Sequence, residues 1–123
     1  MKKILALFVS FAAFLGCNSQ TAYKSVDVAA FAEVISNSDV QLVDARTASE
    51  YAEGHIPGAV NIDVKSGDFD KQIATLDASR PVAVYCRSGR RSKAAAARLS
   101  KAGYEVIELN SGILSWPGKL ETR

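Results

Sequence analysis

The sequence has few of the residues that bind metals or form disulfide bonds, since its 123 residues include one histidine and two cysteines. A protein zinc site takes three or four ligands, and Cys and His supply most of them. We therefore expect no metal site, and no other cofactor is indicated. A Cys17–Cys86 disulfide is the alternative for an exported protein. Separate roles for the two cysteines are favoured, because Cys17 lies at the end of an N-terminal targeting segment.

A large excess of one charge is also absent, because 15 Lys and Arg residues face 13 Asp and Glu residues. Lys2 and Lys3 belong to the targeting segment described next, and without them the two signs balance. Domains that bind nucleic acid usually carry a clear basic excess. The composition therefore indicates a protein without a nucleic-acid partner.

No apolar run is long enough to span a bilayer, which takes about 20 residues in a helix. The longest, 4–15, follows Lys2 and Lys3 and precedes Gly16-Cys17, the layout of a signal peptide covering residues 1–16. The end of this segment resembles a bacterial lipoprotein signal, which implies that Cys17 is lipidated and that residues 17–24 form a flexible tether. We expect export to the periplasm or cell envelope and membrane contact through this lipid alone. A plain signal peptide is the alternative.

Strand and helix patterns alternate through the remaining residues, which we interpret as one α/β domain over residues 25–120. Apolar strands that alternate with helices favour a mainly parallel sheet covered by helices on both faces. In such sheets the binding crevice lies at the carboxyl ends of the strands, where Asp44 and Cys86 both fall. The expected elements are a helix at 28–35 capped by Asp27, a strand at 40–43, a short helix from the capping box Thr47–Glu50, a turn at 55–58, a strand at 59–62, a helix at 69–76, a strand at 82–85, an alanine-rich helix before Gly103 and a strand at 105–109.

The segment Cys86-Arg87-Ser88-Gly89-Arg90-Arg91-Ser92 joins the strand at 82–85 to the alanine-rich helix. A glycine-containing turn at a helix N-terminus directs main-chain amides and the positive end of the helix dipole at one point. Together with three arginines, this setting lowers a thiol pKa and favours the thiolate. We therefore predict that Cys86 is a partly exposed nucleophile and that residues 87–91 bind an anionic substrate. The alternative is an inert, buried structural cysteine.

Three blocks in the same order resemble the single-domain rhodaneses, a sulfurtransferase family. They are 43–61, which includes Val43-Asp44-Ala45-Arg46 and Gly54-His55-Ile56-Pro57-Gly58; the cysteine segment 84–92; and 103–116, which ends at Gly112 and Trp116. The resemblance implies a rhodanese-like fold with about five strands. It also implies a reaction in which the Cys86 thiolate takes the sulfane sulfur of thiosulfate, or of a related persulfide or polysulfide, and passes it to a thiol or cyanide. We expect a monomer in which Asp44, Arg46, Glu50 and His55 support the site structurally.

The length of the cysteine loop distinguishes this reaction from phosphate chemistry. Cysteine-dependent phosphatases place an arginine six positions after the nucleophile, where this chain has Ser92, whereas Arg91 stands one position earlier. An arginine displaced in this way cannot form the bidentate clamp on a phosphate oxyanion. Phosphatase or arsenate reductase activity is therefore a minor alternative. The main alternative to a sulfurtransferase is a sulfur-carrying or binding module without turnover.

Overall fold

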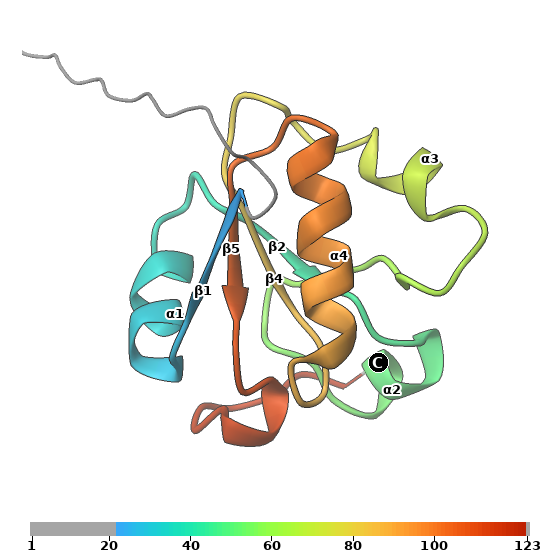
Figure 1. Cartoon of the computed structure of the whole chain (residues 1–123). Helices are drawn as coiled ribbons and strands as arrows, with labels where there is room; N and C mark the ends of the chain where they lie inside the picture. The colour runs from blue at the N-terminus through green and yellow to red at the C-terminus, as the bar shows by residue number, and fades with distance from the viewer. Residues whose placement is uncertain (1–21, 123) are drawn as a thin grey trace, which may run out of the picture.

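The computed structural model describes residues 22–122, and these form a five-stranded sheet in the order β1-β5-β4-β2-β3 (Figure 1). Every pairing between neighbouring strands is parallel, as expected for alternating strands and helices. The expectation of an α/β fold with a mainly parallel sheet of about five strands is confirmed. The strands are β1 (Tyr23–Val26), β2 (Gln41–Asp44), β3 (Val60–Asn61), β4 (Val82–Tyr85) and β5 (Val106–Leu109).

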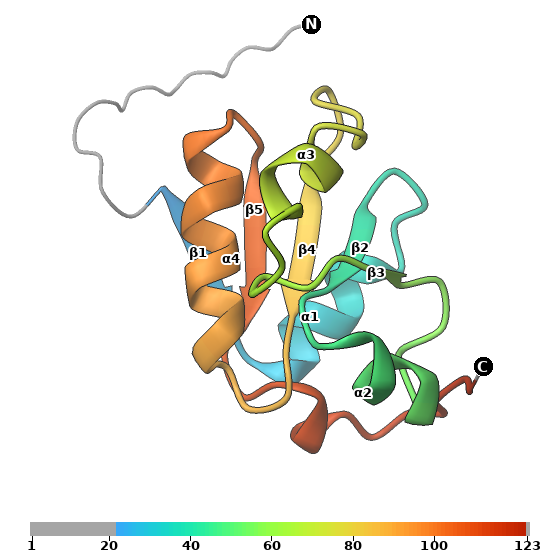
Figure 2. The ribbon, with the colours of Figure 1, turned by 90° about the vertical axis from the view of Figure 1, so that its right-hand side faces the viewer.

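Helices cover both faces of this sheet, as the alternating pattern predicts. Figure 2 shows α3 and α4 in front of the strands and α1 behind them. The short helix α2 lies near the end of the sheet where the strands terminate. The helices are α1 (Val28–Ile35), α2 (Ala48–Glu53), α3 (Phe69–Ile73), α4 (Arg90–Lys101) and the 3-10 helix η2 (Ile113–Ser115). In the described part of the chain, none of them is long and apolar enough to cross a membrane.

The central strand β4 forms the middle of the core, because all four of its residues are fully buried. Val82 and Val84 pack into the cluster beneath α3 and α4, whereas Ala83 and Tyr85 pack into the cluster that contains Phe31 of α1. Burying a large apolar side chain contributes about 1.5–3 kcal/mol. Strand β4 is thus packed on both faces, and Cys86 directly follows its last residue.

The predicted ends of several elements are confirmed in atomic detail. Asp27 caps α1 by accepting a hydrogen bond from the Ala30 amide at 2.9 Å. Thr47 and Glu50 form the expected capping box, with hydrogen bonds of 3.2 Å and 3.0 Å in the two directions. Gly103 follows α4 with φ of +106°, a conformation that ends helices and suits glycine.

The limits of the domain differ from the expected range of 25–120 at both ends. Tyr23 and Lys24, expected in the tether, belong to β1 and pair in parallel with Val106 and Ile107. Near the other end, the amide of Glu121 donates to the carbonyl of His55 at 2.8 Å. Both contacts join segments that are far apart in the sequence, and a local sequence pattern cannot predict such pairing. The signal peptide, Cys17 and residues 17–21 of the tether lie outside the described residues.

Four regular elements are also shorter or shifted relative to expectation, among them β5, which begins at Val106 and not at residue 105. The strand expected at 40–43 lies at 41–44, and the one expected at 59–62 is reduced to the two residues that pair with β2. The helix expected at 69–76 ends at Ile73, because the chain then turns and the Leu76 amide bonds to the Ile73 carbonyl. These differences leave the order and type of the elements unchanged.

Candidate active site

The cysteine segment lies at the carboxyl end of the sheet, where the sequence places it. Cys86 follows β4, and α4 begins four residues later at Arg90. Asp44 ends the neighbouring strand β2 and is in register with Tyr85. The geometry therefore brings Asp44 and Cys86 to the same edge of the sheet, the usual position of a binding crevice in this class of fold.

The sulfur of Cys86 is held by its own loop. The Gly89 amide donates to Sγ at 3.1 Å. Burial is the largest single influence and raises the pKa of the thiol, but hydrogen bonds from the Ser92 hydroxyl and from the amides of Ser92, Gly89 and Ser88 outweigh it and leave the pKa below its ordinary value of 9.0. The predicted preference for thiolate is thus supported by main-chain donors.

The expected partial exposure of Cys86 is wrong, because its exposed fraction is 0%. The reason is geometric. The amides that stabilise the thiolate converge on the inner side of the loop, so the sulfur that they hold points inward as well. The exposed residues of the loop are Arg87, Ser88 and Arg90.

Two glycines allow the loop and the segment after β5 to lie against each other. Gly89 has φ of +104°, and a Cβ there would lie 2.1 Å from the carbonyl oxygen of Asn110. Gly112 has φ of +74°, and a Cβ there would lie 2.2 Å from the carbonyl oxygen of Arg87. The amide of Ile113 donates to the carbonyl of Cys86 at 2.9 Å. The segment that contains Gly112 thus fixes the main chain of the cysteine loop from outside.

The loop arginines line one cavity of about 590 Å³. Its other cations are Lys65 and Arg98, and the full lining is Val64, Lys65, Arg87, Ser88, Arg90, Arg91, Ala94 and Arg98. We call this cavity the basic groove. It joins three predicted substrate-binding arginines into one positively charged surface, which suits an anionic ligand.

Arg91 is less available to a ligand than the sequence suggested, because it forms a bidentate ion pair with Glu50. Its two terminal nitrogens lie 2.7 Å and 3.0 Å from the Glu50 carboxylate oxygens. The hydrogen bond from Arg91, with further bonds from Thr47, lowers the pKa of Glu50 to about 2. Glu50 therefore holds Arg91, which lines the basic groove.

Asp44 and Arg46 form the expected structural ion pair, and neither contacts the sulfur by hydrogen bonding. Nη2 of Arg46 lies 2.6 Å from Oδ2 of Asp44 and also donates to the carbonyl of Gly54 at 2.7 Å. Tyr85 donates its hydroxyl proton to Asp44 at 2.8 Å. This buried network connects β2, β4 and the end of α2.

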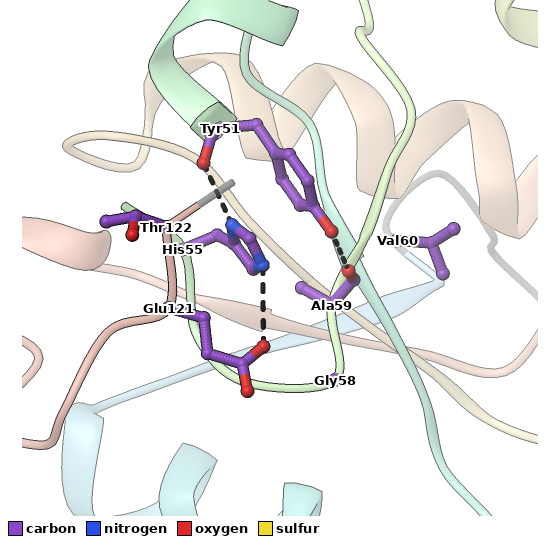
Figure 3. Close-up of a pocket in the computed structure, with 7 residues that line it drawn as sticks. All are labelled: Tyr51, His55, Gly58, Ala59, Val60, Glu121 and Thr122. Carbon is purple, nitrogen blue, oxygen red and sulfur yellow. Dashed lines mark hydrogen bonds and ion pairs between the residues drawn. The ribbon is translucent and has the colours of Figure 1, made fainter. Parts of the chain in front are cut away.

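His55 is packed into a separate cavity of about 670 Å³, which Figure 3 shows. Its ring stacks on Tyr51 with centroids 3.7 Å apart, and Nδ1 lies 2.8 Å from the Tyr51 carbonyl. Nε2 lies 3.6 Å from a carboxylate oxygen of Glu121. None of the residues that line this cavity belongs to the cysteine loop. His55 thus packs between Tyr51 and Glu121, at a cavity separate from the cysteine loop.

Two polar residues beneath the loop are not among the site residues that the sequence predicts. Ser92 and Glu108 both have an exposed fraction of 0%, and the Ser92 hydroxyl donates to Oε2 of Glu108 at 2.5 Å. The available signal was a carboxylate in the middle of the otherwise apolar strand β5. As for metals, residues 22–122 contain no group of three or more His, Cys, Asp or Glu side chains that could hold one.

The comparisons with known proteins agree with this architecture. The sequence profile of the rhodanese-like domain matches residues 27–119, and the chain belongs to this family. It is 33% identical over 101 residues to "Putative sulfurtransferase YtwF" of Bacillus subtilis, covering 81% of this chain and 96% of that protein. It is 30% identical over 97 residues to "Thiosulfate sulfurtransferase GlpE" of Shewanella oneidensis, covering 78% of this chain and 94% of that protein.

A solved structure confirms the fold independently of these names. The rhodanese-related protein of Thermoplasma volcanium superposes with a TM-score of 0.73 at 27% identity, covering 82% of this chain and all of that one. Names differ across the relatives, however, and include a putative sulfur carrier protein. The family is therefore shown, and several of its relatives are named as sulfurtransferases; the activity and the substrate of this chain are separate questions.

Proposed function

We propose that this protein is a thiosulfate-type sulfurtransferase that works through a persulfide on Cys86. The observation that carries the proposal is the set of hydrogen-bond donors around the sulfur, the Ser92 hydroxyl and the amides of the loop, which lowers the pKa of a buried thiol beside a groove lined by arginines. Donors fixed in this way stabilise developing negative charge without reorganising. They suit both the thiolate and the terminal sulfur of a persulfide anion.

The reaction proceeds in two displacements. In the first, the Cys86 thiolate attacks the sulfane sulfur of thiosulfate, a Cys86–sulfur bond forms, and the bond to the sulfonate sulfur breaks as sulfite leaves with its electron pair. In the second, a thiolate or cyanide attacks the outer persulfide sulfur and Cys86 is released as a thiolate. Splitting one transfer into two steps is the usual advantage of a covalent intermediate.

The basic groove is proposed to bind the sulfonate end of the donor. Arg87 and Arg90 are exposed at its rim, and Arg91 is oriented there by Glu50. Guanidinium groups recognise oxyanions through paired hydrogen bonds. Because Cys86 is fully buried, its loop must open before the donor can reach the sulfur.

An intact-mass measurement tests this proposal. Incubation with thiosulfate should add the mass of one sulfur atom, located on the peptide that contains Cys86, and cyanide should remove it. Cys86→Ser should give no adduct on that peptide. A wild-type protein that takes up no sulfur overturns the proposal, whereas an adduct that forms once without multiple turnovers of thiosulfate and cyanide would favour a sulfur carrier.

We further propose that the protein is exported and anchored by a lipid on Cys17, on the basis of the N-terminal pattern of charge, apolar residues and Gly16-Cys17. The test is fractionation of cells that express the full chain. Wild-type protein should sediment with membranes, and Cys17→Ser should not. A wild-type protein found only in the soluble fraction contradicts the anchor.

A further inference from the structure

Glu108 is a buried carboxylate that the proposed sulfur transfer does not use. It lies on β5 and faces the same side of the sheet as Val106, which packs into the cluster beneath α4. Its oxygens accept hydrogen bonds from the hydroxyls of Ser25 on β1 and Ser92 on α4, both at 2.5 Å. Carboxylates are rarely buried without partners. The two serine hydroxyls are the partners of this one.

Ser92 connects this carboxylate to the nucleophile. Its hydroxyl donates to Glu108, and it is also one of the hydrogen-bond donors that lower the pKa of the Cys86 thiol. A serine hydroxyl carries a single hydrogen. It can therefore donate to the carboxylate or to the thiolate, but not to both at once.

We propose that Glu108 is a positioning residue that competes with the Cys86 thiolate for the Ser92 hydroxyl proton and so sets the acidity and nucleophilicity of the thiol. With Cys86 as a thiol, Ser92 donates to Glu108. When the thiol loses its proton to solvent, the hydroxyl turns toward the sulfur and Glu108 retains Ser25 and Lys93. Glu108 thus keeps the thiolate less stabilised, and more nucleophilic, than the loop amides and Ser92 could make it.

The groups that face Glu108 come from three elements. Helix α4 contributes Ser92 and Lys93, whose Nζ lies 3.4 Å from both carboxylate oxygens. Strand β1 contributes the neutral hydroxyl of Ser25, and the end of β4 contributes Cys86 through Ser92. Lys93 also donates to the carbonyl of Gly89 at 3.2 Å, so it connects the carboxylate to the cysteine loop.

The test is the pH profile of iodoacetamide alkylation, followed on the peptide that contains Cys86. Glu108→Gln removes the competing charge and should move the alkylation midpoint down by about one pH unit. The plateau rate at high pH should fall about threefold, since a less basic thiolate is a weaker nucleophile. Glu33→Gln, the same change on an exposed face of α1, should leave both unchanged.

Two further variants distinguish this coupling from a general disturbance. Ser25→Ala removes the other hydroxyl donor of Glu108 at an exposed residue, so Glu108 should hold Ser92 more firmly and the midpoint should rise. In a Ser92→Ala background, Glu108→Gln should shift the midpoint by less than half as much as in wild type. Equal shifts in both backgrounds, or shifts of the same sign for Glu108→Gln and Ser25→Ala, overturn the inference.

This inference concerns the nucleophile of the proposed reaction, but alkylation requires no sulfur donor. A protein that fails to form a persulfide can still show the predicted shifts, and an active sulfurtransferase can lack them. The two proposals therefore fail separately.

Discussion

Replacing Gly112 by alanine should damage the cysteine loop from outside, and Gly103→Ala provides the matched control. Both glycines have positive φ, +74° and +106°. A Cβ at Gly103 would meet nothing within 4 Å, whereas one at Gly112 would lie 2.2 Å from the Arg87 carbonyl oxygen and 2.6 Å from the Ser88 nitrogen. The two variants share the conformational strain, and only Gly112→Ala adds an overlap with the main chain of the loop.

The magnitudes follow from these contacts. An L-residue in left-handed backbone costs about 1–2 kcal/mol, which is the whole expected loss for Gly103→Ala. Gly112→Ala must also separate two segments joined by hydrogen bonds from Ile113 to Cys86 and from Leu114 to Arg87. At about 0.5–1.5 kcal/mol each, these bring its loss to about 2–5 kcal/mol. In a domain of this size each kcal/mol lowers Tm by about 4–8 °C.

The assay pairs thermal unfolding with alkylation of Cys86 as a function of pH. Gly112→Ala should lower Tm by clearly more than Gly103→Ala. It should also raise the pKa of Cys86 toward 9.0, because a displaced loop no longer holds the Gly89 amide on the sulfur. Gly103→Ala should leave the pKa unchanged. Equal losses of Tm together with equal pKa values would refute the argument that the segment after β5 fixes the loop.

Three further changes test other parts of the structure. Arg91→Ala should raise KM for thiosulfate about tenfold, and adding Glu50→Gln should restore part of this by removing the carboxylate left at the groove. Glu50 has a pKa lowered from 4.5 to about 2, so its contribution to stability is present above pH 4.5 and is lost as the pH falls toward 2; unfolding of Glu50→Gln should depend less on pH in that range. Phe31→Ala should cost about 3–5 kcal/mol in denaturant unfolding, because the buried ring contacts Tyr85 and Trp116 edge-on; a loss below 1 kcal/mol would contradict its place in the core.

Local signals account for the elements that the sequence predicts well. Helix α1 was expected with its observed limits because Asp27 is a strong N-cap and the apolar residues recur at helical spacing. Strand β1 was missed because its four residues, YKSV, carry no alternation strong enough to predict a strand. It exists through pairing with β5, about eighty positions away in register. Such an edge strand depends on tertiary contacts, which a single-sequence pattern does not contain.

In the site, too, the features set by local sequence are predicted and those that depend on distant residues are not. The glycine turn, the arginines and the helix start predict a thiolate, and the hydrogen bonds around Cys86 lower the pKa of its thiol, which is the direction that this prediction requires. The direction of the sulfur and the pairing of Arg91 with Glu50 depend on residues that are distant in sequence, 41 positions apart in the second case. Ser25 and Glu108, 83 positions apart, meet only because β1 lies beside β5.

The atoms that hold the sulfur and the atoms that line the groove are different, and this separates two properties of the site. The hydrogen bonds to Sγ come from Ser88, Gly89 and Ser92, which belong to the loop main chain or the first turn of α4. The exposed guanidinium groups of Arg87 and Arg90 instead face the groove. Substitutions at these two arginines can therefore change the preferred donor while the ionisation of Cys86 is retained. Glu108 acts on the other side, where it changes the thiolate without contacting a donor.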